Sequence, residues 1–225
     1  MAYTTMTELM HNYRSFAAEK NWAAAHETLL YGVECSHLPA KLELAQLYKE
    51  CTQLGIHQQE RYARSEFHYR GILNLLDDVT DKVTATICME LAELYSYMKR
   101  PVAVLGMLLR AKRYGANVPD REVDYAWQLL LNLDINDFGK FPRDAYELGL
   151  ELSLAGGSVR LTELLLQEAT ECTNKLIRDQ AALALADFYN DRRSENYVYA
   201  SEATRYYRMA AESGYPEYIS RRIAK

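Results

Sequence analysis

Apolar residues recur along the chain at a spacing close to 3.6 residues, which is the repeat of an amphipathic α-helix. No stretch shows the sustained alternation of apolar and polar residues that indicates a half-buried strand. The pattern therefore predicts an all-α protein. The expected helices span residues 3–19, 21–34, 39–54, 58–77, 80–98, 101–114, 119–133, 141–155, 158–172, 174–190, 196–213 and 216–224.

Proline and glycine mark the expected ends of these helices. A proline costs least in the first turn, where its missing N–H has no helical partner, and a glycine accepts the left-handed conformation of a C-cap. The expected starts are at Pro39, Pro101, Pro119, Pro142 and Pro216. The expected stops are at Gly55, Gly115, Gly156 and Gly214. The connections are short, so consecutive helices should form antiparallel hairpins, and no linker divides residues 1–225 into domains.

One five-residue pattern occurs three times: LAQLY at 44–48, LAELY at 91–95 and LADFY at 185–189. The second interval between copies is twice the first. On a helix the leucine, the second apolar residue and the tyrosine share one face, and the alanine is small enough to let a neighbouring helix approach closely. An Ala-x-x-x-Gly ending follows two of the copies, at Ala111–Gly115 and Ala210–Gly214. The pattern indicates helical hairpins that repeat.

These residues resemble a known family. LADFY, followed by a loop and ATRYYRMAAESGYPEY, is similar to a Sel1-like repeat, and residues 85–119 resemble a tetratricopeptide repeat as closely. The clearest repeats are 40–77, 85–119 and 181–218. The glycine usual after the first leucine is replaced by alanine in all three copies, and residues 119–172 carry no clear copy. The resemblance implies an α-solenoid of about six antiparallel hairpins in one domain.

The resemblance also implies a function. Sel1-like proteins work as adaptors or scaffolds, commonly in bacteria, so we expect a non-catalytic protein that binds another protein or peptide. The alternative is a dedicated neutralising partner, such as an immunity protein or a secretion chaperone, for one toxin or effector. An enzyme or a nucleic-acid-binding solenoid ranks third, because the chain shows no nucleophile elbow, phosphate-binding loop or HExxH pair.

The net charge and the composition limit the classes of partner that we expect. The net charge of −5 and the pI near 5.6 are opposite to the basic surface that binding to duplex nucleic acid requires. We expect no membrane contact, because the longest uncharged apolar run is far shorter than the roughly 20 residues that span a bilayer. The first residues lack the apolar core of a signal peptide, so a cytoplasmic protein is expected.

No cofactor or metal is expected. The four cysteines form no CxxC pair and are interpreted as small buried apolar residues in a reducing compartment. The five histidines include no pair on one helix face, and the strongest alternative is a calcium site at Asp77, Asp78 and Asp81. Helix capping by Thr80 or Asp81 explains that acidic turn more simply.

Tyrosine is unusually frequent, at 18 residues against 10 glycines. The tyrosines of the motif, Tyr48, Tyr95 and Tyr189, are predicted to pack between helices. Tyrosine also suits interfaces, because it combines a large rigid surface with one hydroxyl. The tyrosines outside the clearest packing positions, which are candidates for partner contacts, are Tyr97, Tyr197, Tyr199 and Tyr207.

The candidate binding surface consists of the variable positions within and after the motif. In arrays of helical hairpins the first helices line the concave face, and these positions are expected to point there. The candidate residues are Gln46, Lys49, Glu50, Glu93, Tyr97, Asp187, Asn190 and Asp191. The series Gln46, Glu93 and Asp187 runs from polar to acidic, which favours a polar or basic partner segment. A solvated face without a partner would show the same pattern.

Overall fold

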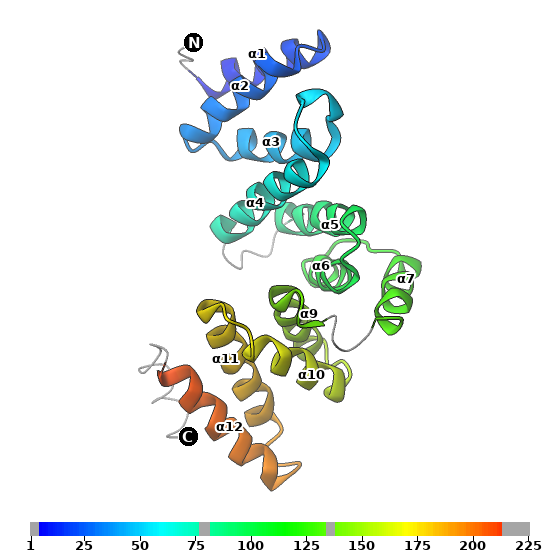
Figure 1. Ribbon diagram of the computed structural model, residues 1–225, viewed down its shortest axis with the longest axis vertical. Coiled ribbons are helices and arrows are strands. Elements are labelled where there is room, and N and C mark those ends of the chain that lie inside the picture. Colours follow the sequence, from blue (N-terminus) through cyan, green and yellow to red (C-terminus); the bar gives the residue numbers. More distant parts are fainter. Residues whose placement is uncertain (1–4, 77–81, 134–137, 213–225) are drawn as a thin grey trace. The chain divides into compact units, whose positions relative to one another are not determined.

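The computed structural model describes residues 5–76, 82–133 and 138–212, which contain eleven α-helices and no strand (Figure 1). The all-α prediction is therefore confirmed for the described part of the chain. The predicted acidic turn at Asp77, Asp78 and Asp81 and the predicted helix 216–224 lie outside the described residues.

The helices belong to two compact units. The first unit contains the described residues up to Lys99 together with Tyr114–Ala116, and the second contains Arg100–Arg113 and the described residues from Asn117 onward. The helices of the first unit are α1 (Met6–Ala18), α2 (Trp22–Glu34), α3 (Leu38–Glu50), the 3-10 turn η1 (Thr52–Leu54), α4 (Gln58–Leu76) and α5 (Lys82–Tyr97). The helices of the second unit are α6 (Pro101–Arg113), α7 (Asp120–Leu131), α9 (Pro142–Leu154), α10 (Val159–Thr170), α11 (Lys175–Asp191) and α12 (Tyr197–Glu212).

Neighbouring helices pack in pairs within each unit. In the first unit each helix from α1 to α4 packs on the next, and in the second unit α9 to α12 do the same while α6 packs on both α7 and α9. The boundary between Lys99 and Arg100 falls inside the span 85–119, which the sequence predicts as one repeat. The helices of the other two predicted repeats, α3 with α4 and α11 with α12, each lie within one unit.

Several predicted helix ends agree with the backbone, but the helix predicted over 39–54 ends at Glu50, and Gly55 follows the 3-10 turn η1 instead. Pro101 and Pro142 are the first residues of α6 and α9, and Pro39 is the second residue of α3. Gly115 and Gly156 have φ values of 87° and 67°, in the left-handed region that glycine adopts without a steric cost. After α9, the N–H of Gly157 donates to the carbonyl of Leu152 at 2.8 Å, which completes a Schellman C-cap.

Three helix ends adopt the same left-handed backbone conformation without a glycine. Lys20, Ser36 and Lys99 have φ values of 58°, 61° and 56° and follow α1, α2 and α5 at the corresponding position. The cap bonds that the first two helices need are made, since Asn21 N–H donates to Phe16 and His37 N–H donates to Gly32. A side chain in the left-handed region costs roughly 1–2 kcal/mol, so these residues are strained.

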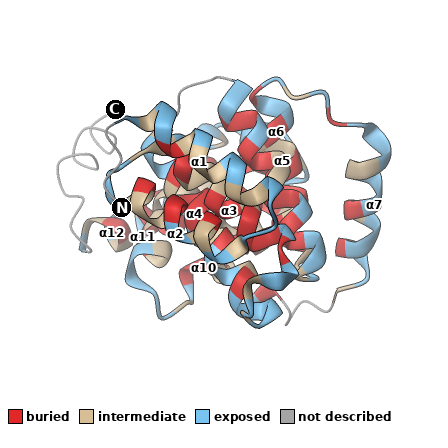
Figure 2. Cartoon of the chain, turned by 90° about the horizontal axis from the view of Figure 1, so that it is seen from above, coloured by how far each residue is buried: buried red, intermediate tan, exposed pale blue. Residues whose placement is uncertain are grey.

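The core of the first unit forms where α1, α2 and α3 meet. Leu9, Leu29 and Leu44 are fully buried, and their helices approach closely at Gly32, where a Cβ atom would lie 2.5 Å from the Ala40 Cβ. Figure 2 shows the buried residues gathered on the helix faces that meet other helices. The core of the second unit includes Leu185 and Ala186 of α11, which pack against α12.

The motif tyrosines pack between helices, as the sequence predicts, and each is almost fully buried. The Tyr48 hydroxyl lies 2.7 Å from His26 Nε2 of α2, and the Tyr95 hydroxyl donates to Glu66 of α4 at 2.9 Å. The Tyr189 hydroxyl donates to Glu163 of α10. Each copy of the motif therefore sends one hydroxyl to a polar side chain of a neighbouring helix, where an unpaired hydroxyl would be costly to bury.

Two of the sequence expectations need correction. Cys51 and Cys88 are buried as expected, but Cys172 is only half-buried and Cys35 is exposed, because it caps the end of α2 rather than facing the core. Tyr207, a candidate contact residue, is buried, and its hydroxyl donates to Asp187 at 2.6 Å. The candidate Tyr197 is 86% exposed.

Two arginine–carboxylate pairs join α6 to α9 in the second unit. Arg100 donates to both carboxylate oxygens of Asp144 at 2.9 and 2.6 Å, and Arg113 donates to both oxygens of Glu151 at 2.9 and 2.8 Å. Asp144 and Glu151 are 1% and 4% exposed, so these are buried charges held in bidentate geometry.

Candidate functional site

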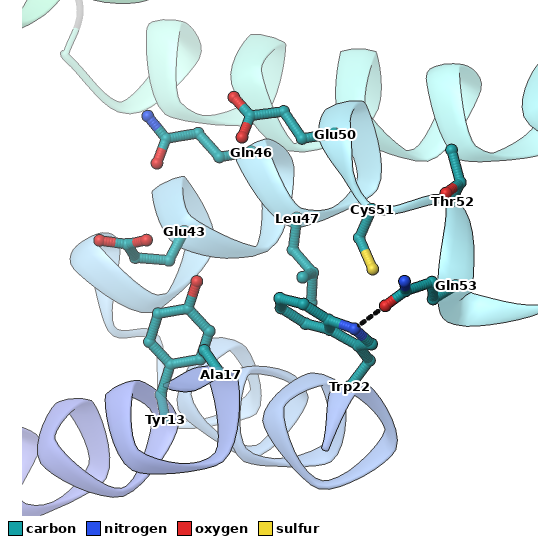
Figure 3. Close-up of a pocket in the computed structure, with 10 residues that line it drawn as sticks. All are labelled: Tyr13, Ala17, Trp22, Glu43, Gln46, Leu47, Glu50, Cys51, Thr52 and Gln53. Atoms are coloured by element: carbon teal, nitrogen blue, oxygen red, sulfur yellow. Dashed lines mark hydrogen bonds between the residues drawn. The ribbon is translucent and has the colours of Figure 1, made fainter. Parts of the chain in front are cut away.

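A cavity of about 420 Å³ lies in the first unit between α1, the start of α2, α3 and η1 (Figure 3). It is lined by Tyr13, Ala17, Trp22, Glu43, Gln46, Leu47, Glu50, Cys51, Thr52 and Gln53. Two carboxylates and two large aromatic rings are among these ten described residues, and no lysine or arginine is. The lining therefore combines negative charge with aromatic surface.

The polar wall of the cavity is one face of α3. Glu43, Gln46 and Glu50 stand at positions i, i+3 and i+7 of that helix, which places them in one stripe. The two carboxylate-bearing residues are about 10.5 Å apart along the helix axis at 1.5 Å per residue. Leu47, in the same stripe, is buried and extends toward Trp22 (Figure 3). On this face the carboxylates of Glu43 and Glu50 flank the amide of Gln46, and the apolar side chain of Leu47 lies beside them.

The aromatic wall is held by polar contacts. Tyr13 extends from α1 toward Glu43 (Figure 3), and burial, together with the charge of Glu43 and a hydrogen bond to it, raises the pKa of the Tyr13 hydroxyl to about 12. The Trp22 indole Nε1 donates to the side-chain oxygen of Gln53 in η1. The Trp22 ring is therefore held at the edge of the cavity by a hydrogen bond, and the raised pKa keeps the Tyr13 hydroxyl protonated.

Beside this stripe, Lys49 forms a buried ion cluster. Its Nζ lies 2.5 Å from Glu90 and 2.7 Å from Glu93 of α5, while Glu50 is 3.9 Å away. Burial alone would lower the pKa of Lys49, but its hydrogen bonds to Glu90 and Glu93 outweigh that effect and raise it. One cation is surrounded by three carboxylates, so the cluster carries a net negative charge.

Glu93 and Tyr97 continue this acidic surface on α5. The Tyr97 hydroxyl donates to Glu93 at 2.7 Å, and hydrogen bonds from Lys49 and then Tyr97 lower the pKa of Glu93. The Tyr97 ring is 52% exposed and stacks on Tyr62 of α4 with ring centres 6.0 Å apart. An exposed aromatic ring therefore borders the carboxylates of the cluster.

The structure brings together the candidate binding residues of the first unit. Lys49, Glu50, Glu93 and Tyr97 form one contiguous cluster, and Glu50 also lines the cavity with Gln46. Lys49 itself is buried, with 3% of its side chain exposed, so it organises the carboxylates rather than presenting its charge at the surface.

The other candidates lie on α11 in the second unit. Asp187 accepts the hydrogen bond from Tyr207, Asn190 is half-buried, and Asp191 is exposed. Asp187 therefore has a structural partner within its own unit. Asp191 is the most accessible of the three.

Sequence reasoning missed much of the cavity wall, namely Tyr13, Trp22, Glu43, Thr52 and Gln53. The signal for Glu43 was present, because it lies one turn before Gln46 on the same helical face. Tyr13 and Trp22 come from helices with no copy of the motif. Only tertiary packing brings them to α3.

The described residues contain no group of three or more histidine, cysteine, aspartate or glutamate side chains that could hold a metal ion. None of the helices that the structure describes is long and apolar enough to cross a membrane. Comparison of the chain with protein-family models, with curated proteins and with solved structures gave no match.

Proposed function

We propose that the chain is a non-catalytic scaffold or adaptor, built as an α-solenoid of Sel1-like hairpins. It binds a partner protein by recognising a basic segment of that partner. The paired packing of neighbouring helices and the buried motif tyrosines support the repeat architecture. Such arrays stack small helical units and use the surface of the stack for recognition.

The acidic surface of the first unit is the observation that carries the proposal. Glu50 and Glu93 have side chains 72% and 49% exposed, and Glu90 is 23% exposed beside them. Tyr97 adds an exposed ring of the type enriched in interfaces. The negative charge of this surface would increase the association rate and the specificity of a basic partner segment more than its affinity.

Site-specific photo-crosslinking tests the proposal. A benzoylphenylalanine residue at Tyr97 should capture a partner in the cells that express the chain, whereas the same probe at Tyr125, an exposed residue of α7, should capture it far less. Glu50→Lys should weaken capture at Tyr97 several-fold, with a smaller effect at high salt. Equal capture at the two positions, or capture unaffected by Glu50→Lys, would contradict the acidic surface as the binding site.

The same experiment separates two kinds of binding protein. Several partners captured in sub-stoichiometric amounts are expected for an adaptor. A single partner captured in a one-to-one complex would identify a dedicated neutralising protein. Glu50 is the residue to reverse, because Glu93 holds the buried Lys49 and its replacement would disturb folding.

A further inference from the structure

We propose that the cavity between α1 and α3 is a receptor for one arginine side chain of the partner's basic segment. The inference rests on the proposed function and adds the residue type that is recognised and the place where it binds. The carrying observation is the combination, in one cavity of about 420 Å³, of aromatic rings and carboxylates with no basic side chain among the ten lining residues.

The charge of the cavity selects a cation. Glu43 and Glu50 both face it from α3, and Glu50 lies only at the long distance of 3.9 Å from Lys49 and remains largely exposed. An anionic ligand would meet both carboxylates without a compensating cation from the lining. A ligand cation would pair with at least one of them in a partly enclosed space, where screening by water is weaker than on an open surface.

The shape and the aromatic wall favour arginine over lysine. A guanidinium is planar, stacks on aromatic rings and donates from five N–H groups, whereas an ammonium is a compact, strongly hydrated point charge. Trp22 and Tyr13 supply ring surface, and Glu43, Gln46 and Glu50 supply acceptors at successive positions along α3. The three methylenes of arginine would pack on Leu47 and the rings.

The Trp22 ring is held in place before a ligand arrives. Its hydrogen bond to Gln53 ties the start of α2 to η1, and Tyr13 of α1 extends toward Glu43 of α3 (Figure 3). Holding the receptor groups in their binding positions reduces the entropy lost on association. A single residue is therefore a sufficient ligand for a direct test.

The chain offers an internal reference for that test. It has two tryptophans, Trp22 at the cavity and Trp127 on α7 in the second unit. In a ¹⁵N-labelled sample their indole N–H groups give two separate signals. Titration with N-acetyl-arginine amide should shift the Trp22 signal in a saturable manner and leave the Trp127 signal in place.

Three probes and three variants define the result. N-acetyl-citrulline amide, which has the shape of arginine without its charge, should bind at least tenfold more weakly, and N-acetyl-lysine amide at least threefold more weakly. Glu43→Gln and Glu50→Gln should each weaken arginine binding several-fold, whereas Glu27→Gln, an exposed acid of α2 outside the cavity, should leave it unchanged. Circular dichroism melting curves check that the variants fold.

Several outcomes would overturn the inference. No shift of Trp22 would reject the site, equal binding of citrulline would reject its electrostatic basis, and equal binding of lysine would reject the choice of arginine. Partner capture at Tyr97 separates this inference from the proposed function. Capture that persists in Glu43→Gln while the titration is flat would reject the arginine receptor alone, whereas arginine binding without any captured partner would reject the scaffold function.

Discussion

The helices that carry the repeated motif and the helices between residues 100 and 172 are held together by different polar contacts. In the first group a tyrosine hydroxyl reaches a polar side chain of the preceding helix, as Tyr95 does with Glu66. In the second group an arginine clamps a carboxylate on a helix far along the chain, as Arg100 does with Asp144. Both devices bury polar groups. The arginine pairs bury two charges between α6 and α9, whereas in the motif helices a buried charge occurs beside the tyrosine contacts, at Lys49 with Glu90 and Glu93.

The difference has an energetic consequence. A hydroxyl–carboxylate bond contributes little net free energy, on the order of 1–3 kcal/mol when an ion takes part. A buried ion pair can be neutral when compared with an apolar pair of the same size, but removing one partner leaves an uncompensated charge. The second unit should therefore be fragile to single changes at α6 and α9 and tolerant of paired changes.

The largest expected effect on stability is at the pair Arg100–Asp144, which we call the α6–α9 clamp. Arg100→Leu should lower the free energy of unfolding by about 3–5 kcal/mol, because Asp144 would remain charged and almost fully buried. Chemical denaturation of the purified variant measures this loss.

A double variant makes the comparison specific. Arg100→Met combined with Asp144→Leu removes both charges and should recover most of the lost stability. A double variant as unstable as Arg100→Leu would show that Arg100 stabilises the unit through packing rather than through its charge.

The next effect is a pH dependence of the first unit. His68 stacks on the motif tyrosine Tyr48, and burial, helped by the positive charges of Lys41 and Arg64, lowers its pKa to about 4. Below pH 6.5 the unfolded chain binds a proton at His68 that the folded chain does not take up until near pH 4. Stability is therefore lost as the pH falls, by about 2 kcal/mol between pH 7.5 and pH 5.

Neutral variants isolate this contribution. His68→Gln cannot be protonated, so its unfolding free energy should fall less between the two pH values than that of the parent chain. His57→Gln, at an exposed position, is the matched control and should keep the full dependence. Identical pH profiles for the parent and His68→Gln would assign the dependence to other groups.

A stability loss of similar or smaller size is expected when the helix packing at the motif is disturbed. Ala186 is fully buried on α11, where its small side chain lets a neighbouring helix approach. Ala186→Leu should overpack this contact and lower stability by about 1–3 kcal/mol. Ala200→Leu, at an exposed position of α12, should have little effect in the same thermal melts. Equal midpoints for the two variants would place the close approach elsewhere.

Much of the helical fold could be predicted from the sequence, because its signals are local. Apolar periodicity locates the helices, and proline and glycine fix ends such as Pro142 and Gly156. The α6–α9 clamp could not be predicted, because Arg100 and Asp144 are 44 residues apart and nothing local links them. The candidate site divides in the same way: Gln46 and Glu50 follow from the motif, whereas Trp22 joins them only through packing.

Local sequence signals also fail where a residue adopts a backbone conformation that its type disfavours. Lys99 ends α5 in the left-handed region, and its N–H donates to the carbonyl of Ser96 at 3.1 Å. A lysine does not indicate such a cap from sequence. In the second unit the corresponding position after α9 holds Gly156, which the sequence analysis recognised as a stop.

The smallest expected effect is a gain in stability. It tests the contrast between the helix end at Lys99 and the helix end at Gly156. Lys99→Gly should raise the free energy of unfolding by about 0.5–1 kcal/mol, because removing the Cβ relieves a strain of roughly 1–2 kcal/mol while glycine costs part of that gain in chain entropy. Lys99→Ala is the matched control, since it shortens the side chain but keeps the Cβ, and it should give no gain. Thermal and denaturant unfolding of both variants measure the difference. If Lys99→Ala stabilises the chain as much as Lys99→Gly, the lysine side chain and not the left-handed backbone carries the cost, and the helix ends of the two units do not differ in the way proposed.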